Sequence, residues 1–177
     1  MKAAQDVGGI GQEQRYREAI TEFGPALDRL ARGYEANADL RRDLRQDIHV
    51  QIWRSLAKFD GRCSLKTWVY RVAHNVAATH VLKRKSKVEL LGLDEIEDAP
   101  GDDDPEAAVG ERQALDRLQT LIRALKPPDS QIMLLYLEDF DAAAIGEVTA
   151  LSAGAVAVKI HRIKAVLAGR FHQGRTR

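Results

Sequence analysis

The chain has 177 residues, of which 45% are hydrophobic and 30% charged, and its 13 glycines and 5 prolines are too few for a collagen-like or wholly disordered protein. A single cysteine, Cys63, excludes an internal disulfide bond, and no apolar run approaches the roughly 20 residues that a membrane-spanning helix needs. The first residues lack the apolar centre of a secretory signal, so we expect a cytoplasmic protein.

Positive and negative charges balance in total but separate along the chain. The 27 Lys and Arg residues against 26 Asp and Glu residues give a net charge of +1. Residues 89–106 contain nine acidic residues and no Lys or Arg, whereas residues 153–177 contain six Lys or Arg and no acid. This segregation says more about binding partners than the total charge does.

The N-terminal half has the spacing of helices. Residues 1–13 are rich in Gly and Gln, and we expect them to be disordered. Residues 14–34 mix apolar and polar side chains at helical spacing, with Pro25 as a kink or a division. The next apolar residues recur every fourth position, which predicts one buried face of a helix: Leu40, Leu44, Ile48, Ile52 and Leu56. Residues 59–64 interrupt the pattern, and Ser64 can cap the following helix.

The composition of the chain then changes at two points, residues 88 and 111. Residues 88–110 hold the acidic run together with Pro100, Gly101 and Pro105, which predicts a flexible linker. Residues 111–177 return to helical spacing. No segment shows sustained two-residue alternation, so we expect no sheet. The sequence therefore predicts an all-α protein with two small helical domains, residues 14–87 and 111–177, joined by a flexible acidic linker.

The last two predicted helices have the proportions of a helix-turn-helix. Asp141 can cap a helix over residues 142–148, residues 149–151 would turn the chain, and Ser152 can cap the next helix. In that second helix Val156, Ile160, Ile163 and Leu167 would face inward, which leaves Lys159, Arg162 and Lys164 on other sides. Cations for phosphates and small side chains for base edges suit the major groove of DNA. A helical hairpin with an ordinary solvated basic face is the alternative.

The residues of both halves resemble the extracytoplasmic-function family of bacterial sigma factors. The resemblance in the first half rests on residues 43–54 (DLRQDIHVQIWR), 58–62 (KFDGR) and 66–75 (KTWVYRVAHN), followed by a basic cluster near Arg84. These are similar to the family's second conserved region. Residues 155–163 (AVAVKIHRI) are similar to the end of its fourth region. The resemblance covers roughly residues 14–87 and 111–170.

The resemblance implies a protein that binds core RNA polymerase and directs promoter recognition, DNA melting and transcription initiation. A loop with an aromatic pocket, polar groups for base edges and cations for phosphates would hold the melted strand. The residues expected to contact the −10 element are Lys58, Phe59, Arg62, Ser64, Lys66, Arg71, His74, Asn75, Thr79, Lys83 and Arg84, with Lys85 and Lys87 on upstream phosphates. Those expected at the −35 element are Ser152, Ala153, Ala155, Val156, Ala157, Lys159 and Arg162. Those expected on the polymerase are Asp43, Leu44, Gln46, Asp47, Gln51 and Arg54.

The helix-turn-helix departs from the family pattern in two ways. The turn glycine is replaced by Ala150, and a glycine stands inside the first helix at Gly146. In the second helix Ala153, Ala155, Ala157 and Val158 can touch thymine methyl groups but cannot form paired hydrogen bonds to purines. Recognition of the −35 element would therefore rest on phosphate contacts and DNA shape, and the sequence of that element is not predicted.

Two other functions stay open. A helix-turn-helix regulator acting without polymerase would explain the C-terminal half, and a sigma-like adaptor that binds only protein would explain the weak recognition helix. We expect no enzyme, because the sequence contains no phosphate-binding glycine loop and no nucleophile–base pairing. We likewise expect no cofactor, no metal and no small-molecule substrate. The family also implies an anti-sigma protein as a partner.

Overall fold

The computed structural model describes residues 3–90 and 109–173, and within these residues it contains seven helices and no strand. The chain divides into two compact units between Ala99 and Pro100. The predicted all-α fold with two helical domains is confirmed. Most of the predicted linker lies outside the described residues. Its two ends do not: residues 88–90 and 109–110 are helical.

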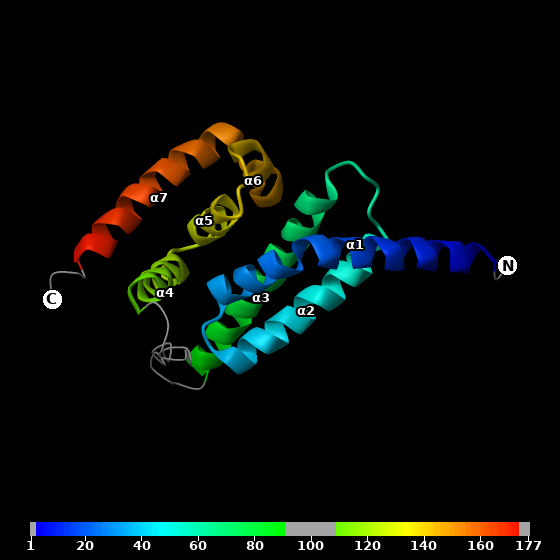
Figure 1. The fold of residues 1–177 in the computed structure, drawn as a ribbon, viewed down its shortest axis with the longest axis horizontal. Helices are drawn as coiled ribbons and strands as arrows, with labels where there is room; N and C mark the ends of the chain where they lie inside the picture. The colour runs from blue at the N-terminus through cyan, green and yellow to red at the C-terminus, as the bar shows by residue number, and fades with distance from the viewer. Residues whose placement is uncertain (1–2, 91–108, 174–177) are drawn as a thin grey trace. The chain divides into compact units, whose positions relative to one another are not determined.

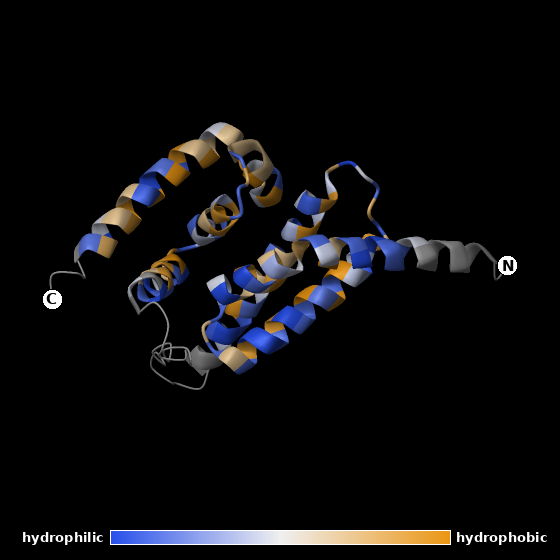
Figure 2. Ribbon diagram, viewed as in Figure 1, coloured by the Kyte–Doolittle hydropathy of each residue, from blue (hydrophilic) through white to orange (hydrophobic). Residues whose placement is uncertain are grey.

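Three helices form the N-terminal unit: α1 (Ala3–Tyr34), α2 (Ala38–Leu56) and α3 (Leu65–Leu90). Each packs against the other two, as Figure 1 shows. Four members of the predicted stripe of α2, Leu44, Ile48, Ile52 and Leu56, lie in the core and are at most 1% exposed. The first member, Leu40, is 38% exposed, so its prediction as buried was wrong. The opposite side of α2 is mainly hydrophilic (Figure 2). Burial of this apolar stripe is the main force that holds α2 in the bundle.

The first helix differs from its prediction at two points. It begins at Ala3, so residues 3–13, expected to be disordered, are helical. From residue 12 on, side-chain contacts support the helix: Glu13 pairs with Arg17, Gln14 bonds Glu18, and Gln12 donates to the carbonyl of Trp53 at 2.7 Å. Pro25 does not divide the helix, which continues through it to Tyr34.

Local side-chain bonds set the starts of α2 and α3. The side chain of Asn37 accepts hydrogen bonds from the backbone N–H groups of Asp39 and Leu40. Ser64 caps α3 as predicted, because its Oγ accepts from the Thr67 N–H at 3.0 Å. The chain between the two helices turns at Gly61, whose φ of 76° is one that glycine adopts without steric cost.

Four helices form the C-terminal unit: α4 (Val109–Arg123), α5 (Asp129–Leu137), α6 (Ala142–Thr149) and α7 (Ala153–Gln173). The other three all pack against α7. Their shared core contains Ile122, Ile132, Leu135, Ile145, Val156 and Ile163, all at most 2% exposed.

The predicted helix-turn-helix is present in α6 and α7, which meet at 103°. Asp141 caps α6 by accepting from the Ala144 N–H at 2.8 Å, and Ser152 Oγ accepts from the Ala155 N–H at 3.2 Å. Ala150 occupies the left-handed region in the turn, with φ of 59°. Gly146 lies where an added Cβ would come within 2.5 Å of the Leu151 carbonyl oxygen. The displaced glycine therefore permits the close approach of the turn.

Among the described residues, no single helix is long and apolar enough to span a membrane. The bent pair of α6 and α7 meets the length and composition test only when its two members are counted together.

Candidate polymerase and nucleic-acid interface

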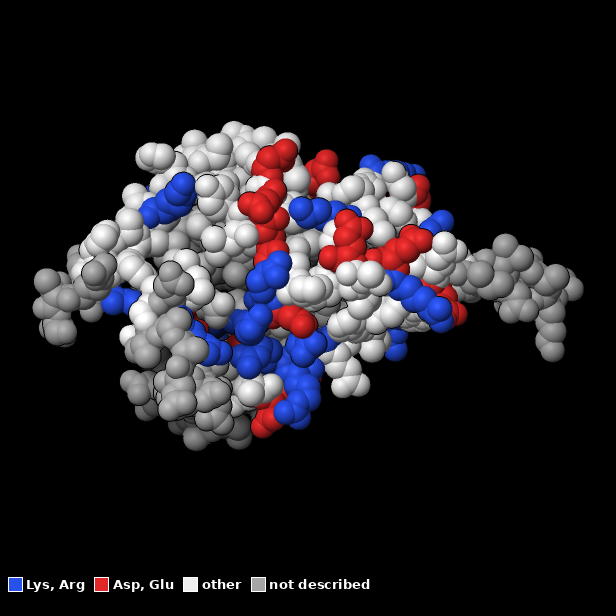
Figure 3. All heavy atoms as spheres, in the orientation of Figure 1, with Lys and Arg blue, Asp and Glu red and all other residues white. Residues whose placement is uncertain are grey.

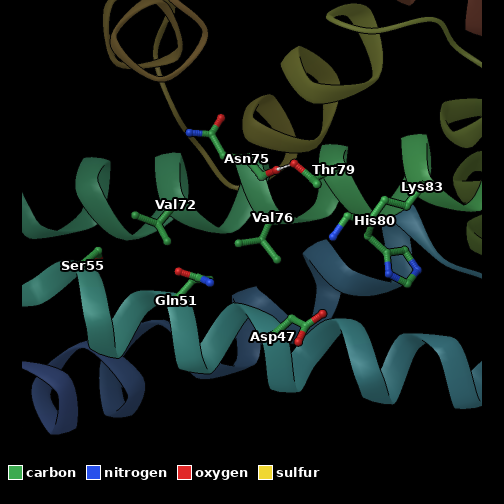
Figure 4. A pocket seen from close by; sticks show the side chains of 9 residues that line it. All are labelled: Asp47, Gln51, Ser55, Val72, Asn75, Val76, Thr79, His80 and Lys83. Atoms are coloured by element: carbon green, nitrogen blue, oxygen red, sulfur yellow. Dashed lines mark hydrogen bonds between the residues drawn. The ribbon is translucent and has the colours of Figure 1, made fainter.

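A groove of about 570 Å³ runs between α2 and α3 (Figure 4). Its walls come from both helices: Asp47, Gln51 and Ser55 on α2, and Val72, Asn75, Val76, Thr79, His80 and Lys83 on α3. Residues expected on two different partners thus line one surface. Asp47 and Gln51 were predicted for the polymerase, whereas Asn75, Thr79 and Lys83 were predicted for DNA.

Asn75 has an exposed side chain on α3. Figure 4 shows it projecting from α3 on the side away from α2, while Val76 and Gln51 point into the space between the helices. The Thr79 hydroxyl donates to the backbone carbonyl of Asn75 at 2.8 Å and so does not occupy the side-chain amide of Asn75. A carboxamide in this position has the donor and acceptor needed to read a base edge.

Five of the six residues expected on the polymerase are exposed along α2: Asp43, Gln46, Asp47, Gln51 and Arg54. Leu44 is the exception, because its side chain is fully buried in the helix bundle. The prediction for Leu44 was wrong, and its four-residue spacing with Ile48 and Ile52 was the signal that it belongs to the core.

The loop between α2 and α3 is built on an aromatic pair. The rings of Phe59 and Trp68 meet edge to face at 5.5 Å, and Trp68 donates through Nε1 to Ser55 at 3.0 Å. Around this pair Lys58 and Arg62 are exposed, and Arg62 pairs with Asp60 at 2.9 Å. Lys66 and Arg71 are half-buried on α3. The loop therefore places two aromatic rings close to several basic side chains.

His74 was expected to contact DNA, and the structure places it in the core instead. Its ring is 1% exposed, and its Nδ1 lies 2.7 Å from the Tyr34 hydroxyl. Desolvation by burial lowers the pKa of His74 to about 3, so the ring is neutral in the folded protein. A neutral ring beneath the surface contacts neither base nor phosphate.

Arg84 was also expected on DNA, but its guanidinium is engaged within the protein. Glu35, which is fully buried just after α1, accepts from Arg84 Nη1 with both carboxylate oxygens at 2.8 Å. His80 Nε2 lies 3.1 Å from the same carboxylate. Lys83 and Lys85 remain exposed beside it, whereas the side chain of Lys87 lies outside the described residues. Figure 3 shows Lys and Arg side chains gathered where the first half of α2 adjoins the last half of α3.

The residues expected at the −35 element divide into three groups. Ser152, Ala153, Ala155 and Ala157 are exposed. Val156 is fully buried, and its prediction as a DNA contact was wrong because it faces the core with Ile163. Lys159 and Arg162 both pair with Asp129 of α5, at 2.8 and 3.1 Å.

Sequence reasoning missed the carboxylates that hold these cations, Glu35 and Asp129. They lie 49 and 30 residues from the partners they bind, and no local pattern links residues so far apart. Val158, which is 70% exposed on α7, lies at the surface as expected for a side chain that can touch a thymine methyl.

Comparison with known proteins matches both units to one family. Residues 19–87 match the model of sigma-70 region 2, and residues 115–167 match a model of sigma-70 region 4. The ECF RNA polymerase sigma factor SigW of Bacillus subtilis (strain 168) is 24% identical over 163 residues, covering 86% of either chain. The solved structure of CnrH in complex with the cytosolic domain of CnrY has a similar fold. Its TM-score is 0.67 at 19% identity, and the match covers 95% of this chain and 94% of that one.

Proposed function

Since the chain belongs to the sigma-70 family as an extracytoplasmic-function sigma factor, which binds RNA polymerase and recognises promoters, we propose how its two domains divide this work. The domain of residues 14–87 binds core polymerase and melts the −10 element. The domain of residues 111–177 binds the −35 element, and residues 88–110 join the two. The groove between α2 and α3 is the observation that carries this proposal.

The polymerase-binding face is the exposed side of α2. Asp43, Gln46, Asp47, Gln51 and Arg54 offer both signs of charge and two amides on one helix. A mixed polar face of this kind suits a helix partner through ion pairs and hydrogen bonds rather than through apolar burial alone.

The melted −10 strand lies along the adjoining side of α3 and the loop before it. Asn75 offers hydrogen bonds to a base edge, and the Phe59–Trp68 pair offers an aromatic surface on which an unstacked base can lie. Lys58, Arg62, Lys66 and Lys83 neutralise phosphates, and Arg71 and Thr79 flank Asn75 on α3. The polymerase face on α2 and the strand face on α3 adjoin along the groove between the two helices.

In the C-terminal domain, α7 enters the major groove at the −35 element. Ala153, Ala155 and Ala157 face the base edges, while Ser152, Lys159 and Arg162 lie at the phosphates. The protein acts in the cytoplasm as an initiation factor. The polymerase performs the chemistry.

We also propose an anti-sigma protein as a regulatory partner that covers the polymerase-binding faces. The support is the structural relative CnrH, which was solved in complex with the cytosolic domain of another protein, CnrY. A partner that spans both domains would keep α2 from the polymerase.

Run-off transcription tests the proposal. The protein and bacterial core polymerase are incubated with host genomic DNA, using the wild type, Asn75→Ala and the control Gln113→Ala, an exposed amide on α4. We expect discrete transcripts that require the protein, fall at least about tenfold with Asn75→Ala, a loss of 1.4 kcal/mol, and persist with Gln113→Ala. Binding to core polymerase without transcripts would favour the adaptor, and DNA binding without polymerase binding would favour the plain regulator.

A further inference from the structure

One carboxylate in the C-terminal domain holds both of the cations assigned to DNA phosphates. Asp129 is the first residue of α5, and its Oδ1 lies 2.8 Å from Lys159 Nζ while its Oδ2 lies 3.1 Å from Arg162 Nη2. Lys159 and Arg162 are three residues apart on α7, which places them on one side of that helix. The carboxylate side chain is only 21% exposed, whereas that of Arg162 is 64% exposed.

The surroundings favour a negative charge at this position. The start of α5 carries the positive end of the helix dipole, and Pro128 before it makes no side-chain cap. The two carboxylate oxygens of Asp129 therefore lie next to a helix N-terminus and two cations. A DNA phosphate presents the same chemistry, two charged oxygens that accept from Lys and Arg.

We infer that Asp129 is an internal competitor of DNA phosphate that limits the affinity of α7 for any duplex. The inference rests on the proposed role of the C-terminal domain at the −35 element. With Asp129 ionised, the three side chains carry a net charge of +1 rather than +2. Because the phosphate contribution to binding does not depend on base sequence, lowering it weakens binding to specific and non-specific DNA by the same factor and leaves the sequence-dependent contacts of α7 intact.

The experiment measures binding of the full chain to a short duplex of mixed sequence by fluorescence anisotropy across a range of salt concentrations. Asp129→Asn is compared with Asp116→Asn, which makes the same charge change on the exposed side of α4. One additional net cation at the phosphates steepens the salt dependence by about 0.9 and tightens binding about eightfold at ~0.1 M salt, with convergence near 1 M. Asp116→Asn should leave the salt slope unchanged and should change the affinity by less than about twofold, because its carboxylate does not compete for cations at the phosphates.

A second comparison separates competition from a purely structural link between α5 and α7. In the Arg162→Gln background, Asp129→Asn should gain less affinity than in the wild type, because one of the released cations is missing. Thermal unfolding of each variant monitors the fold. Equal gains for Asp129→Asn and Asp116→Asn, or weaker binding by Asp129→Asn, would overturn the inference.

The two proposals fail differently. Loss of −35 dependence in run-off transcription would contradict the proposed role of the domain, whatever Asp129 does. Normal −35 dependence together with no gain from Asp129→Asn would contradict only the inference about Asp129.

Discussion

The buried carboxylate of Glu35 and the guanidinium of Arg84 join the end of α1 to the last half of α3. Arg84 Nη1 donates to both oxygens of Glu35 at 2.8 Å, and the Glu35 side chain is 0% exposed while that of Arg84 is 38% exposed. The Asn37 N–H also donates to Glu35 at 3.0 Å. Arg84, which was predicted as a phosphate contact, therefore helps to hold the helices of the N-terminal unit together.

Replacing Arg84 should destabilise the N-terminal domain. Arg84→Ala leaves the Glu35 carboxylate buried with His80 as its remaining side-chain partner in the ion cluster, and we expect a loss of about 2 kcal/mol in the free energy of unfolding, measured in urea. The neighbouring Lys83→Ala removes an exposed cation and should change stability by less than about 0.5 kcal/mol. Adding Glu35→Gln to Arg84→Ala should recover part of the loss. Equal stability of the two single variants would contradict a structural role for Arg84.

The buried His74 should make the domain sensitive to acid. Its pKa is about 3 in the folded protein because of desolvation, whereas an exposed histidine in the unfolded chain has a pKa near 6.5. Between these values only the unfolded chain binds the proton, so stability is highest above pH 6.5 and falls as the pH drops towards 3. We expect a loss of about 2 kcal/mol between pH 7.5 and pH 5.0, at ~1.4 kcal/mol per pH unit below 6.5.

Urea unfolding at the two pH values checks this. Tyr34→Phe keeps His74 and should keep the wild-type dependence on pH, although it removes the 2.7 Å hydrogen bond. The double variant Tyr34→Phe/His74→Leu removes the titrating ring and should lose the part of the pH dependence of stability that comes from His74. An unchanged pH dependence in the double variant would assign the effect to other groups.

The turn of the helix-turn-helix should respond in opposite directions at its two unusual positions. Ala150 has φ of 59°, where glycine is preferred, so Ala150→Gly should raise stability by about 1 kcal/mol. A Cβ at Gly146 would meet the Leu151 carbonyl oxygen at 2.5 Å, so Gly146→Ala should lower stability by about 1–3 kcal/mol despite the higher helix propensity of alanine. Thermal unfolding measures both. The exposed Gly154, with open space around its Cβ position, is the control, since Gly154→Ala should follow helix propensity alone.

The apolar surface of α7 should make −35 recognition depend on thymine methyl groups. Residues 153–158 contain only Ala, Gly and Val, so their side chains cannot hydrogen-bond to base edges, and Val158 is 70% exposed. The thymine methyl is the apolar group that the major groove presents. Replacing a contacted thymine by deoxyuridine should weaken promoter use by the holoenzyme about fourfold per methyl, from ~0.8 kcal/mol of burial.

The variant Val158→Ala should reduce the difference between thymine and deoxyuridine templates. Val166 is 41% exposed and lies more than three helical turns after the start of α7. Val166→Ala should therefore leave the difference between the two templates unchanged. Full activity on deoxyuridine templates would show that shape and phosphates alone carry the recognition.

Local sequence patterns were sufficient for most of the elements and for the capped starts of α3, α6 and α7. The four-residue stripe of α2, the caps Ser64, Asp141 and Ser152, and the tight turn at Ala150 each depend on residues within a few positions of one another. The extent of α1 before residue 14 was not predicted, and the bond from Gln12 in this part of α1 to the carbonyl of Trp53 on α2 is a contact that no local pattern shows.

What each functional side chain is free to contact was decided by the tertiary structure. His74 and Arg84 have the residue types and spacing of DNA contacts, yet the core buries His74 and Glu35 binds Arg84. Asn75 and Gln51 were assigned to different partners, and the packing of α2 on α3 places both on one groove. Hydrogen-bond caps and helical periodicity act between near neighbours, so the sequence alone determines them. Burial and ion pairing join residues tens of positions apart, and only the folded chain brings those residues together.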